Sequence, residues 1–168
     1  MTLTLSRISR SQEPLLQNLI QLYTHDFSTF WATSSKGDLQ PDGRFVPYPM
    51  DGYWTRPHWS ASLILIDAAL AGFAMVNDQS HSDEPVGRNM AEFFVLRKYR
   101  GRGIGQLAAE LVFSQHPGSW EVAVARANLD AARFWRRIIN NSDRARNVEE
   151  SDVSNDHWNG PVIRFEWG

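Results

Sequence analysis

The 168-residue sequence contains no cysteine, and this absence removes several kinds of chemistry at once. Disulfide bonds, thiolate-bound metal sites and a cysteine nucleophile are all excluded. A strong charge imbalance is also missing, since the formal net charge is −2 at pH 7 and the isoelectric point is about 6.2. The global charge therefore indicates neither a nucleic-acid-binding protein nor a membrane-surface protein.

Long hydrophobic runs are missing as well. The first 14 residues hold no apolar segment of the kind found in a secretory signal. The longest apolar stretch, residues 61–76, is interrupted by Asp67 and is too short to cross a bilayer. We therefore expect a cytoplasmic protein without membrane spans. Its length is that of a single domain, residues 1–168, with its own hydrophobic core.

The spacing of apolar residues predicts a series of strands and helices. A tight turn is expected at Ala68 and Ala69, between two strands of a central group of three. The predicted strands are 3–9, 62–67, 70–78, 90–96, 120–126 and 161–167, and the predicted helices are 11–23, 104–115 and 128–139. This order predicts an α/β fold with a mixed β-sheet flanked by helices.

A turn rich in glycine and arginine lies within residues 91–113, AEFFVLRKYRGRGIGQLAAELVF, between a predicted strand and a predicted helix. Such a turn directs unpaired backbone N–H groups and the positive end of the helix dipole at the space above it. Its glycines allow positive φ and the close approach of a phosphate, and its arginines add charged donors. The pattern predicts a phosphate-binding turn, but a plain strand-to-helix turn with solvated arginines would have the same composition.

Two familiar phosphate motifs do not fit this turn. A Walker loop needs Lys and then Ser or Thr after its last glycine, whereas Gln106 and Leu107 follow Gly105. The dinucleotide fingerprint needs glycines at spacing one and then two, but the position after Gly105 is Gln106 and not glycine. Glu121 also opens its strand, where a ribose-binding carboxylate should close one. Both motifs are excluded.

The spacing Arg100-x-x-Gly103-x-Gly105, with Val95 five positions before the arginine, resembles the acyl-CoA signature of the GNAT superfamily, the GCN-related N-acetyltransferases. A second segment, NLDAARFW at residues 128–135, is similar to the Asn-x-x-Ala-x-x-Phe-Tyr signature of that family. Both signatures stand in the family's order, and the resemblance covers nearly the whole chain. It implies a GNAT-like fold, with a mixed, splayed central β-sheet flanked by helices.

The resemblance also implies that acetyl-CoA is the acyl donor and that no metal is needed. In the family, the turn holds the pyrophosphate, the splayed strand pairs with the pantetheine arm, and the asparagine lies beside that arm. The cofactor-binding residues implied in this way are Phe93, Val95, Arg100, Gly101, Arg102, Gly103, Ile104, Gly105, Asn128 and Trp135. Phe93 and Val95 could equally be strand core, and Asn128 could be a simple helix cap.

Catalysis in this family is a direct attack of an amine on the thioester, which needs a neutral amine and an oxyanion-stabilising donor. A backbone N–H near Phe93 to Val95 can be that donor. Glu92 is the best candidate base, because a carboxylate in an apolar strand is either functional or turned to solvent. Both readings of Glu92 stay open at this point.

The acceptor amine is not identified by the sequence, and it can be a small molecule or a peptide. Residues 34–60 contain four prolines and three glycines without a sustained period, so a long irregular segment is expected there. Long loops in compact domains are usually functional. We therefore take Asp26, Tyr53 and Trp54 as weak candidates for the acceptor site, together with His25.

Trp135 stands where many relatives have a tyrosine near the CoA sulfur. An indole N–H can donate a hydrogen bond but cannot give up its proton at neutral pH. A thiolate leaves without much assistance, since a thiol has a pKa of about 8.5. Catalysis without this acid is therefore expected, and a purely structural position for Trp135 in the core stays open.

Two other readings remain. The chain could be a non-catalytic GNAT-like module that binds acyl-CoA, or its basic cluster Arg97, Lys98, Arg100 and Arg102 could bind RNA. The RNA reading is disfavoured by the net charge and by the shortage of interleaved aromatic residues. The interpretation we adopt is an acetyl-CoA-dependent N-acyltransferase that binds neither nucleic acid nor membrane. The sequence leaves open whether it forms a homodimer.

Overall fold

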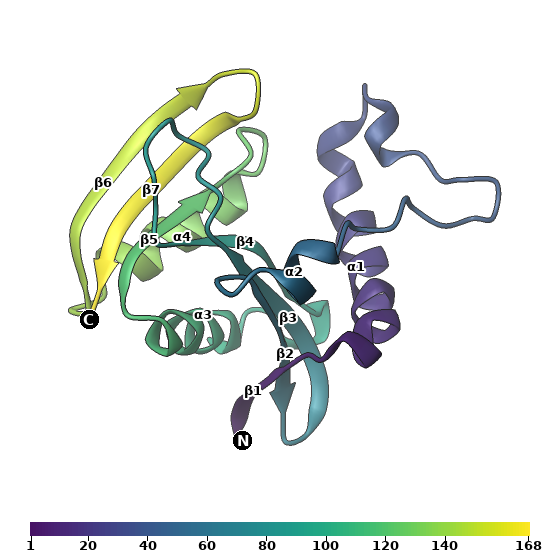
Figure 1. Ribbon diagram of the computed structural model, residues 1–168, viewed down its shortest axis with the longest axis horizontal. Coiled ribbons are helices and arrows are strands. Elements are labelled where there is room, and N and C mark those ends of the chain that lie inside the picture. The colour runs from purple at the N-terminus through teal and green to yellow at the C-terminus, as the bar shows by residue number, and fades with distance from the viewer.

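The computed structural model describes residues 1–168 and contains seven strands. Their bounds are β1 Leu3–Arg7, β2 Ser60–Ile66, β3 Ala69–Asn77, β4 Arg88–Val95, β5 Gly118–Ala123, β6 Ala145–Ser154 and β7 Asn159–Trp167. They form one sheet in the order β1-β2-β3-β4-β5-β7-β6 (Figure 1). Every neighbouring pair is antiparallel except β4 and β5.

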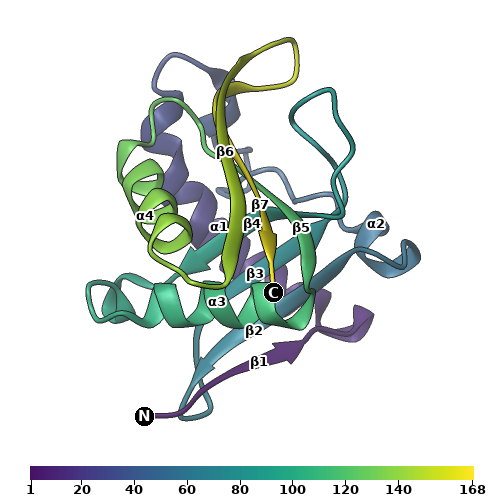
Figure 2. The ribbon, with the colours of Figure 1, turned by 90° about the vertical axis from the view of Figure 1, so that its left-hand side faces the viewer.

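Helices cover both faces of the sheet. They are α1 Glu13–Phe27, α2 Asp51–Thr55, α3 Ile104–Gln115 and α4 Leu129–Asn140. In Figures 1 and 2, α1 and α2 lie on one face, and α3 and α4 lie on the other. The expected α/β fold with a mixed, splayed sheet is thus confirmed. None of the helices has the length and apolar character needed to cross a bilayer.

One strand of the sheet is absent from the sequence-based prediction. Residues of β6 are mostly exposed and polar, and its sequence ARNVEESDVS lacks the apolar alternation of a half-buried strand. It forms an edge strand through backbone pairing with β7 and through the ion pair of Glu150 with Arg136 of α4. A second small correction concerns the β2–β3 turn, where Asp67 and Ala68, rather than Ala68 and Ala69, have positive φ.

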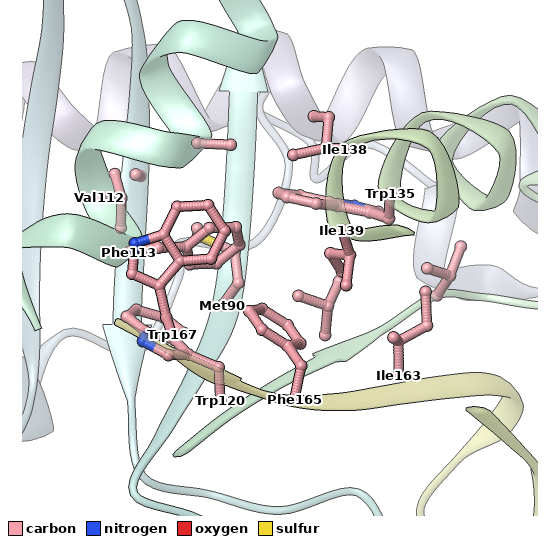
Figure 3. Close-up of a cluster of buried hydrophobic side chains, with 14 of the residues drawn as sticks. Met90, Val112, Phe113, Trp120, Trp135, Ile138, Ile139, Ile163, Phe165 and Trp167 are labelled. Carbon is pink, nitrogen blue, oxygen red and sulfur yellow. The ribbon is translucent and has the colours of Figure 1, made fainter. Parts of the chain in front are cut away.

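An aromatic cluster fills the space between the sheet and the helices α3 and α4. Phe113 of α3 lies at its centre, with ring centroids 4.8 Å from Trp120 of β5 and 5.0 Å from Trp167 of β7 (Figure 3). Each such ring pair adds about 0.5–1.5 kcal/mol to the burial of apolar area. This cluster gives β5 and α4 a rigid backing.

The two parallel strands separate soon after they begin. Residues of β4 and β5 pair only at Arg88 with Trp120 and at Asn89 with Glu121. Beyond these pairs the β4 edge from residue 90 to 95 has no neighbouring strand on that side. The splay leaves backbone N–H and C=O groups that a bound molecule can satisfy.

A β-bulge in β4 decides which face its carboxylate occupies. Met75 of β3 opposes Glu92, while the next residue, Val76, opposes Met90, so Ala91 is one residue extra. Met90 packs into the cluster under α3 and α4. The bulge places Glu92 on the opposite face, toward α1, where strict alternation would have kept it beside Met90.

The irregular segment before α2 is attached to α1 by two glutamine side chains. The amide of Gln17 accepts the N–H of Tyr48 (3.1 Å) and donates to its carbonyl (2.8 Å). The amide of Gln21, one turn later, does the same for Phe45, at 2.8 and 3.2 Å. Each glutamine therefore acts as a strand partner for the segment and holds it against the helix.

Candidate active site

A cleft of about 1110 Å³ opens where β4 and β5 diverge. It runs from the turn before α3, past the free edge of β4, to α1 on the other face. Its lining includes Tyr23, Asp26, Phe27, Phe30, Trp31, Tyr48, His81, Glu92, Phe93, Val95, Arg100, Gly101, Gly103, Gly105, Asn128, Phe134 and Trp135. Most of the residues predicted for the cofactor thus meet in one place with the predicted base.

The glycine turn presents free backbone donors to this cleft. Gly101 and Gly103 have φ of 72° and 77°, and open space lies where a Cβ would stand on either residue. The first intrahelical bond of α3 runs from the Leu107 N–H to the Gly103 carbonyl at 3.1 Å, so the N–H groups of residues 104–106 have no partner in the helix. Arg102 is exposed beside the turn. An anion fits this cradle.

Two further residues of the signatures shape the cofactor end. Gly105 lies close to Phe134, since an added Cβ would be 3.1 Å from its ring and the ring would have to shift slightly to make room. Asn128 caps α4 by accepting the N–H of Ala131 at 3.1 Å. Ile104 is buried beneath the turn. These residues fix the geometry of the cradle.

The free edge of β4 offers two backbone N–H groups to the cleft. The Leu96 N–H donates to Ala71 in β3 at 2.8 Å. Because backbone groups alternate sides along a strand, the N–H groups of Phe93 and Val95 point away from β3, into the splay. The two N–H groups that the sequence offers as oxyanion donors therefore point into the cleft.

Arg100 faces α1 instead of the glycine turn. Its Nε donates to the Val95 carbonyl at 2.6 Å, and its Nη2 donates to Asp26 at 2.7 Å. Arg97 also donates to Asp26, at 2.6 Å. Although partial burial opposes ionisation of Asp26, the hydrogen bonds and charges of the two arginines hold its pKa below the usual value. Asp26 lines the cleft as part of this clamp between α1 and the end of β4.

Glu92 lies in a pocket of phenols. The Tyr23 hydroxyl donates to its Oε2 at 2.5 Å, and Tyr48 lies close enough to interact with the same carboxylate. Burial raises the pKa of Glu92, and the hydrogen bonds from the tyrosines offset only part of that effect. A carboxyl with a raised pKa is suited to take a proton near neutral pH.

Trp135 is both a core residue and part of the cleft wall. It is 6% exposed, and its ring packs edge-on against Phe93 at 5.2 Å and Phe134 at 4.9 Å. Figure 3 shows it on α4 above the aromatic cluster. Trp135 therefore has the core position that the sequence left open, and it also lines the cleft.

The structure does not bring Tyr53, Trp54 or His25 to the cleft. Tyr53 is buried, with its ring 5.0 Å from Trp59, and Trp54 donates its indole N–H to Glu13 at 2.9 Å. Helix α2 turns these aromatic residues inward, against α1, because the apolar surface of β2 and β3 lies there. The long segment contributes Tyr48 instead.

Several lining residues were missed from the sequence. The acceptor side of the cleft is formed by an aromatic group at the end of α1, in which Phe27 lies 5.2 Å from Phe30 and 5.1 Å from Trp31. Tyr23, the last residue of the predicted helix 11–23, has no predicted role, although it stands at the edge of the apolar stripe that the helix shows at positions 15, 16, 19, 20 and 23. A tyrosine at the polar margin of such a stripe was the available signal for a partner. No group of three or more His, Asp or Glu side chains is arranged to hold a metal.

Comparisons with known proteins agree with this geometry. A family model described as the Acetyltransferase (GNAT) family matches residues 16–139, well over half of the chain. Among curated proteins no match is found. An acetyltransferase from Thermus thermophilus is similar in structure, with a TM-score of 0.64, 13% identity, and coverage of 98% of this chain and 96% of that one.

Two further structures of similar fold contain relevant molecules. The PaiA N-acetyltransferase of Thermoplasma acidophilum, in complex with coenzyme A, has a TM-score of 0.59 at 12% identity, covering 99% of this chain and 100% of that one. Arabidopsis thaliana Naa50, in complex with a bisubstrate analogue, has a TM-score of 0.57 at 16% identity, covering 98% of both chains. At these identities the likeness shows the fold.

Proposed function

Since this chain belongs to the GNAT acetyltransferase family, we propose that it transfers an acetyl group from acetyl-CoA to an amine. The observation that carries the proposal is the junction of three features in one cleft. These are an anion cradle with free N–H groups, an open strand edge, and a half-buried carboxylate with a raised pKa. A module that only binds acyl-CoA would have no use for the third feature.

The residues at the cofactor end fit coenzyme A. The cradle of residues 101–106 would hold the pyrophosphate, and the β4 edge at Phe93 and Val95 would pair with the pantetheine amides. Arg102 is better placed than Arg100 to add a charged contact, because Arg100 is already engaged with Asp26. Acetyl-CoA supplies the acetyl group as a thioester.

The chain's own groups then carry the proton and the developing charge. Glu92 accepts the proton that the amine loses as it attacks, and the N–H of Phe93 or Val95 donates to the carbonyl oxygen as it becomes negative. The thiolate leaves without an acid from Trp135, in keeping with its low basicity. The acceptor enters from the side of Phe27, Phe30 and Trp31.

The acceptor class is a small-molecule or peptide amine. Solved structures of this fold include an acetyltransferase bound to CoA and spermine and another bound to a bisubstrate analogue. A screen for thiol release from acetyl-CoA against polyamines, aromatic amines, amino acids and short peptides tests the proposal. Amine-dependent thiol release supports it, and tight CoA binding with no release for any amine supports the non-catalytic module.

The cradle is tested by a pair of matched glycine substitutions. Gly103 and Gly43 have φ of 77° and 79°, and neither has an atom within 4 Å of an added Cβ. Either substitution by alanine should cost about 1–2 kcal/mol of stability through strain at positive φ. Only Gly103→Ala places a methyl group at the cradle, so only this variant should lose CoA affinity, by about tenfold or more.

Isothermal titration with CoA measures the affinity, and thermal unfolding measures the shared strain. Equal CoA affinity in the two variants would contradict the assignment of the turn. A β-branched residue is less suitable for this test, because valine at positive φ perturbs the backbone itself.

A further inference from the structure

Three polar side chains are fully or almost fully buried in this protein, and they form one row across the sheet. Asn77, Asn89 and Glu121 are 5%, 1% and 0% exposed. Asn77 pairs with Asn89 across β3 and β4, and Asn89 pairs with Glu121 across β4 and β5. The row crosses the sheet at the last paired residues of β4 and β5, where the two strands begin to separate. It lies on the α1 face, because Asn77 and Met75 are two residues apart and Met75 opposes Glu92.

Glu121 is ionised within this row. Burial opposes its charge, but its hydrogen bonds with His81 and Ser80 outweigh that effect and lower its pKa. Oε1 accepts the His81 backbone N–H at 2.7 Å, and Oε2 accepts the Ser80 hydroxyl at 2.8 Å. Arg164 of β7 lies 3.9 Å away and partly balances the charge.

The His81 ring is oriented by the same carboxylate. Its Nδ1 lies 3.1 Å from Glu121 Oε1, and the ring packs edge-on against Trp158 at 4.5 Å. A carboxylate only accepts hydrogen bonds, so the ring proton must be on Nδ1, and Nε2 of the neutral ring carries a lone pair. His81 lines the same cleft as Glu92 and is 25% exposed at its side chain.

The loop that carries His81 is held in place without the ring. The β3–β4 loop lies beside the β6–β7 hairpin (Figure 1), where Asn155 donates to the His81 carbonyl at 3.2 Å. The backbone N–H of His81 and the hydroxyl of Ser80 are enough to fasten the loop to Glu121. An imidazole is not required for that structural task.

We propose that His81, positioned by Glu121, accepts the proton that the ammonium form of the acceptor must lose before it can attack, and releases that proton to solvent. The inference rests on the proposed acetyl transfer. At neutral pH most of the amine is protonated, and the protonated form has no lone pair with which to attack the thioester. One N–H bond of the ammonium breaks, its electron pair stays on nitrogen, and the proton passes to Nε2.

This step is separate from the one assigned to Glu92. Transfer of acetyl from a thioester to an ammonium yields amide, thiol and one free proton. The second amine proton leaves as the C–N bond forms, to Glu92, and the thiolate takes up one proton. His81, in the loop at the edge of the cleft, provides the exit for the net proton, whereas Glu92 lies on the central strand β4 and is hydrogen-bonded to Tyr23.

The charged groups that face His81 come from each neighbouring element. They are Glu121 of β5, Arg164 of β7, Glu92 of β4, and Glu84 of the same loop, which pairs with Arg164 at 3.1 Å. All four side chains are kept in a His81→Ala variant, in which Glu121 loses the ring contact but keeps the bond from the His81 backbone N–H.

The decisive experiment compares kcat/KM of wild type, His81→Ala and Asn155→Ala from pH 6.5 to 9.5, on an amine identified by thiol release. His81→Ala should lose about tenfold or more at neutral pH, and the loss should shrink toward pH 9.5, where more of the amine is already neutral. Added imidazole should restore part of the rate. Asn155→Ala removes the hydrogen bond to the His81 carbonyl but keeps the ring and its contact with Glu121, so it should stay within about twofold of wild type.

Three results would overturn the assignment. A deficit in His81→Ala that is the same at every pH, or equal losses in both variants, would mean that the histidine is only a fastening for the loop. Nitrogen NMR of the uniformly labelled protein should find the neutral His81 proton on Nδ1, and a proton on Nε2 would also refute it. In each case amine-dependent thiol release by the wild type would still stand, so failure here is distinct from failure of the acetyltransferase proposal.

Discussion

Glu92, which is half-buried, and Glu121, which is fully buried, are carboxylates on the two strands that splay apart, and their surroundings shift their pKa values in opposite directions. Glu92 receives a hydrogen bond at 2.5 Å from Tyr23, a neutral phenol, and its pKa is raised by burial. Glu121 receives a backbone N–H, a hydroxyl and an imidazole N–H, and lies near an arginine. Burial alone therefore does not decide the charge of a carboxylate here. The number and kind of donors decide it.

The difference suits two different tasks. A base must bind and release a proton near neutral pH, and desolvation brings Glu92 toward that range. A positioning group must keep its charge, and the donors around Glu121 ensure this. The two glutamates can therefore be told apart by experiments that change one charge at a time.

The largest effect is expected from Glu92→Gln. The amide keeps the shape and the contact with Tyr23 but cannot accept the amine proton, so kcat should fall about a hundredfold or more. CoA affinity should not change, because Glu92 lies on the α1 side of the strand. Steady-state kinetics on an identified amine and calorimetry with CoA measure the two quantities.

Glu166→Gln is the matched control, since Glu166 is an exposed carboxylate on β7. It should leave kcat unaltered. Near-normal turnover in Glu92→Gln would show that the carboxylate is structural and that another group takes the proton.

A smaller effect, on stability, should have opposite signs for the two glutamates. The lowered pKa of Glu121 contributes stability above the unfolded carboxyl pKa of about 4.3, and this contribution is lost as pH falls through the folded value. Glu121→Gln should therefore be less stable than wild type near pH 7, by about 1–3 kcal/mol, and the gap should close in acid.

The raised pKa of Glu92 works the other way. Stability falls as pH rises above the unfolded carboxyl pKa of about 4.3, and the loss is complete once pH exceeds the folded pKa, so Glu92→Gln should be at least as stable as wild type at neutral to alkaline pH. Urea unfolding at several pH values measures both gaps. If both variants were less stable than wild type at neutral pH, or both more stable, the distinction between the two sites would be wrong.

The smallest effect should come from the phenol itself. Tyr23→Phe keeps the ring, which packs edge-on against Phe73 at 5.8 Å, but removes the hydrogen bond that lowers the pKa of Glu92. The pKa of Glu92 should rise further, so the rising limb of kcat against pH should move to higher pH. At pH values below this limb kcat should fall a few-fold, which corresponds to about 1 kcal/mol or less of activation free energy. At pH values above the limb kcat should approach that of wild type.

Tyr53→Phe provides the comparison, because the Tyr53 hydroxyl is buried without a hydrogen-bond partner. It should leave the pH profile in place and cost no stability. A shift in Tyr53→Phe as large as that in Tyr23→Phe would mean that the general burial of the pocket, and not the bond to Tyr23, tunes the carboxylate.

The cofactor half of the site was accessible from the sequence because its chemistry is local. The strand, the glycine turn and α3 follow one another along the chain, and the groups proposed to bind the cofactor are backbone N–H groups. The free N–H groups beyond Gly103 and the direction of the Phe93 and Val95 N–H groups agree with that prediction. Arg100 shows the limit of prediction from local sequence. Its partner Asp26 lies 74 residues away in the chain and turns the Arg100 guanidinium toward α1.

The acceptor half was less accessible because its contacts are long-range. Tyr23 and Glu92 are 69 residues apart, and the face on which Glu92 lies depends on a bulge at Ala91 that no periodicity reveals. The sequence gives no sign of the cross-strand row that contains Glu121, because this row is a property of the strand register. β6 was missed since an edge strand exposed on one side needs no apolar alternation.

The two glutamines of α1 that hold the irregular segment before α2 have a consequence for the evolution of this protein. Gln17 and Gln21 grip only the main chain of Tyr48 and Phe45, so they constrain the path of the segment and not the identity of its side chains. Most substitutions of Tyr48 or Phe45 would therefore keep the hydrogen bonds from both glutamines. The wall of the acceptor site can therefore accumulate mutations one at a time while the sheet and the CoA cradle stay folded, which is a simple route by which one scaffold acquires new acceptors.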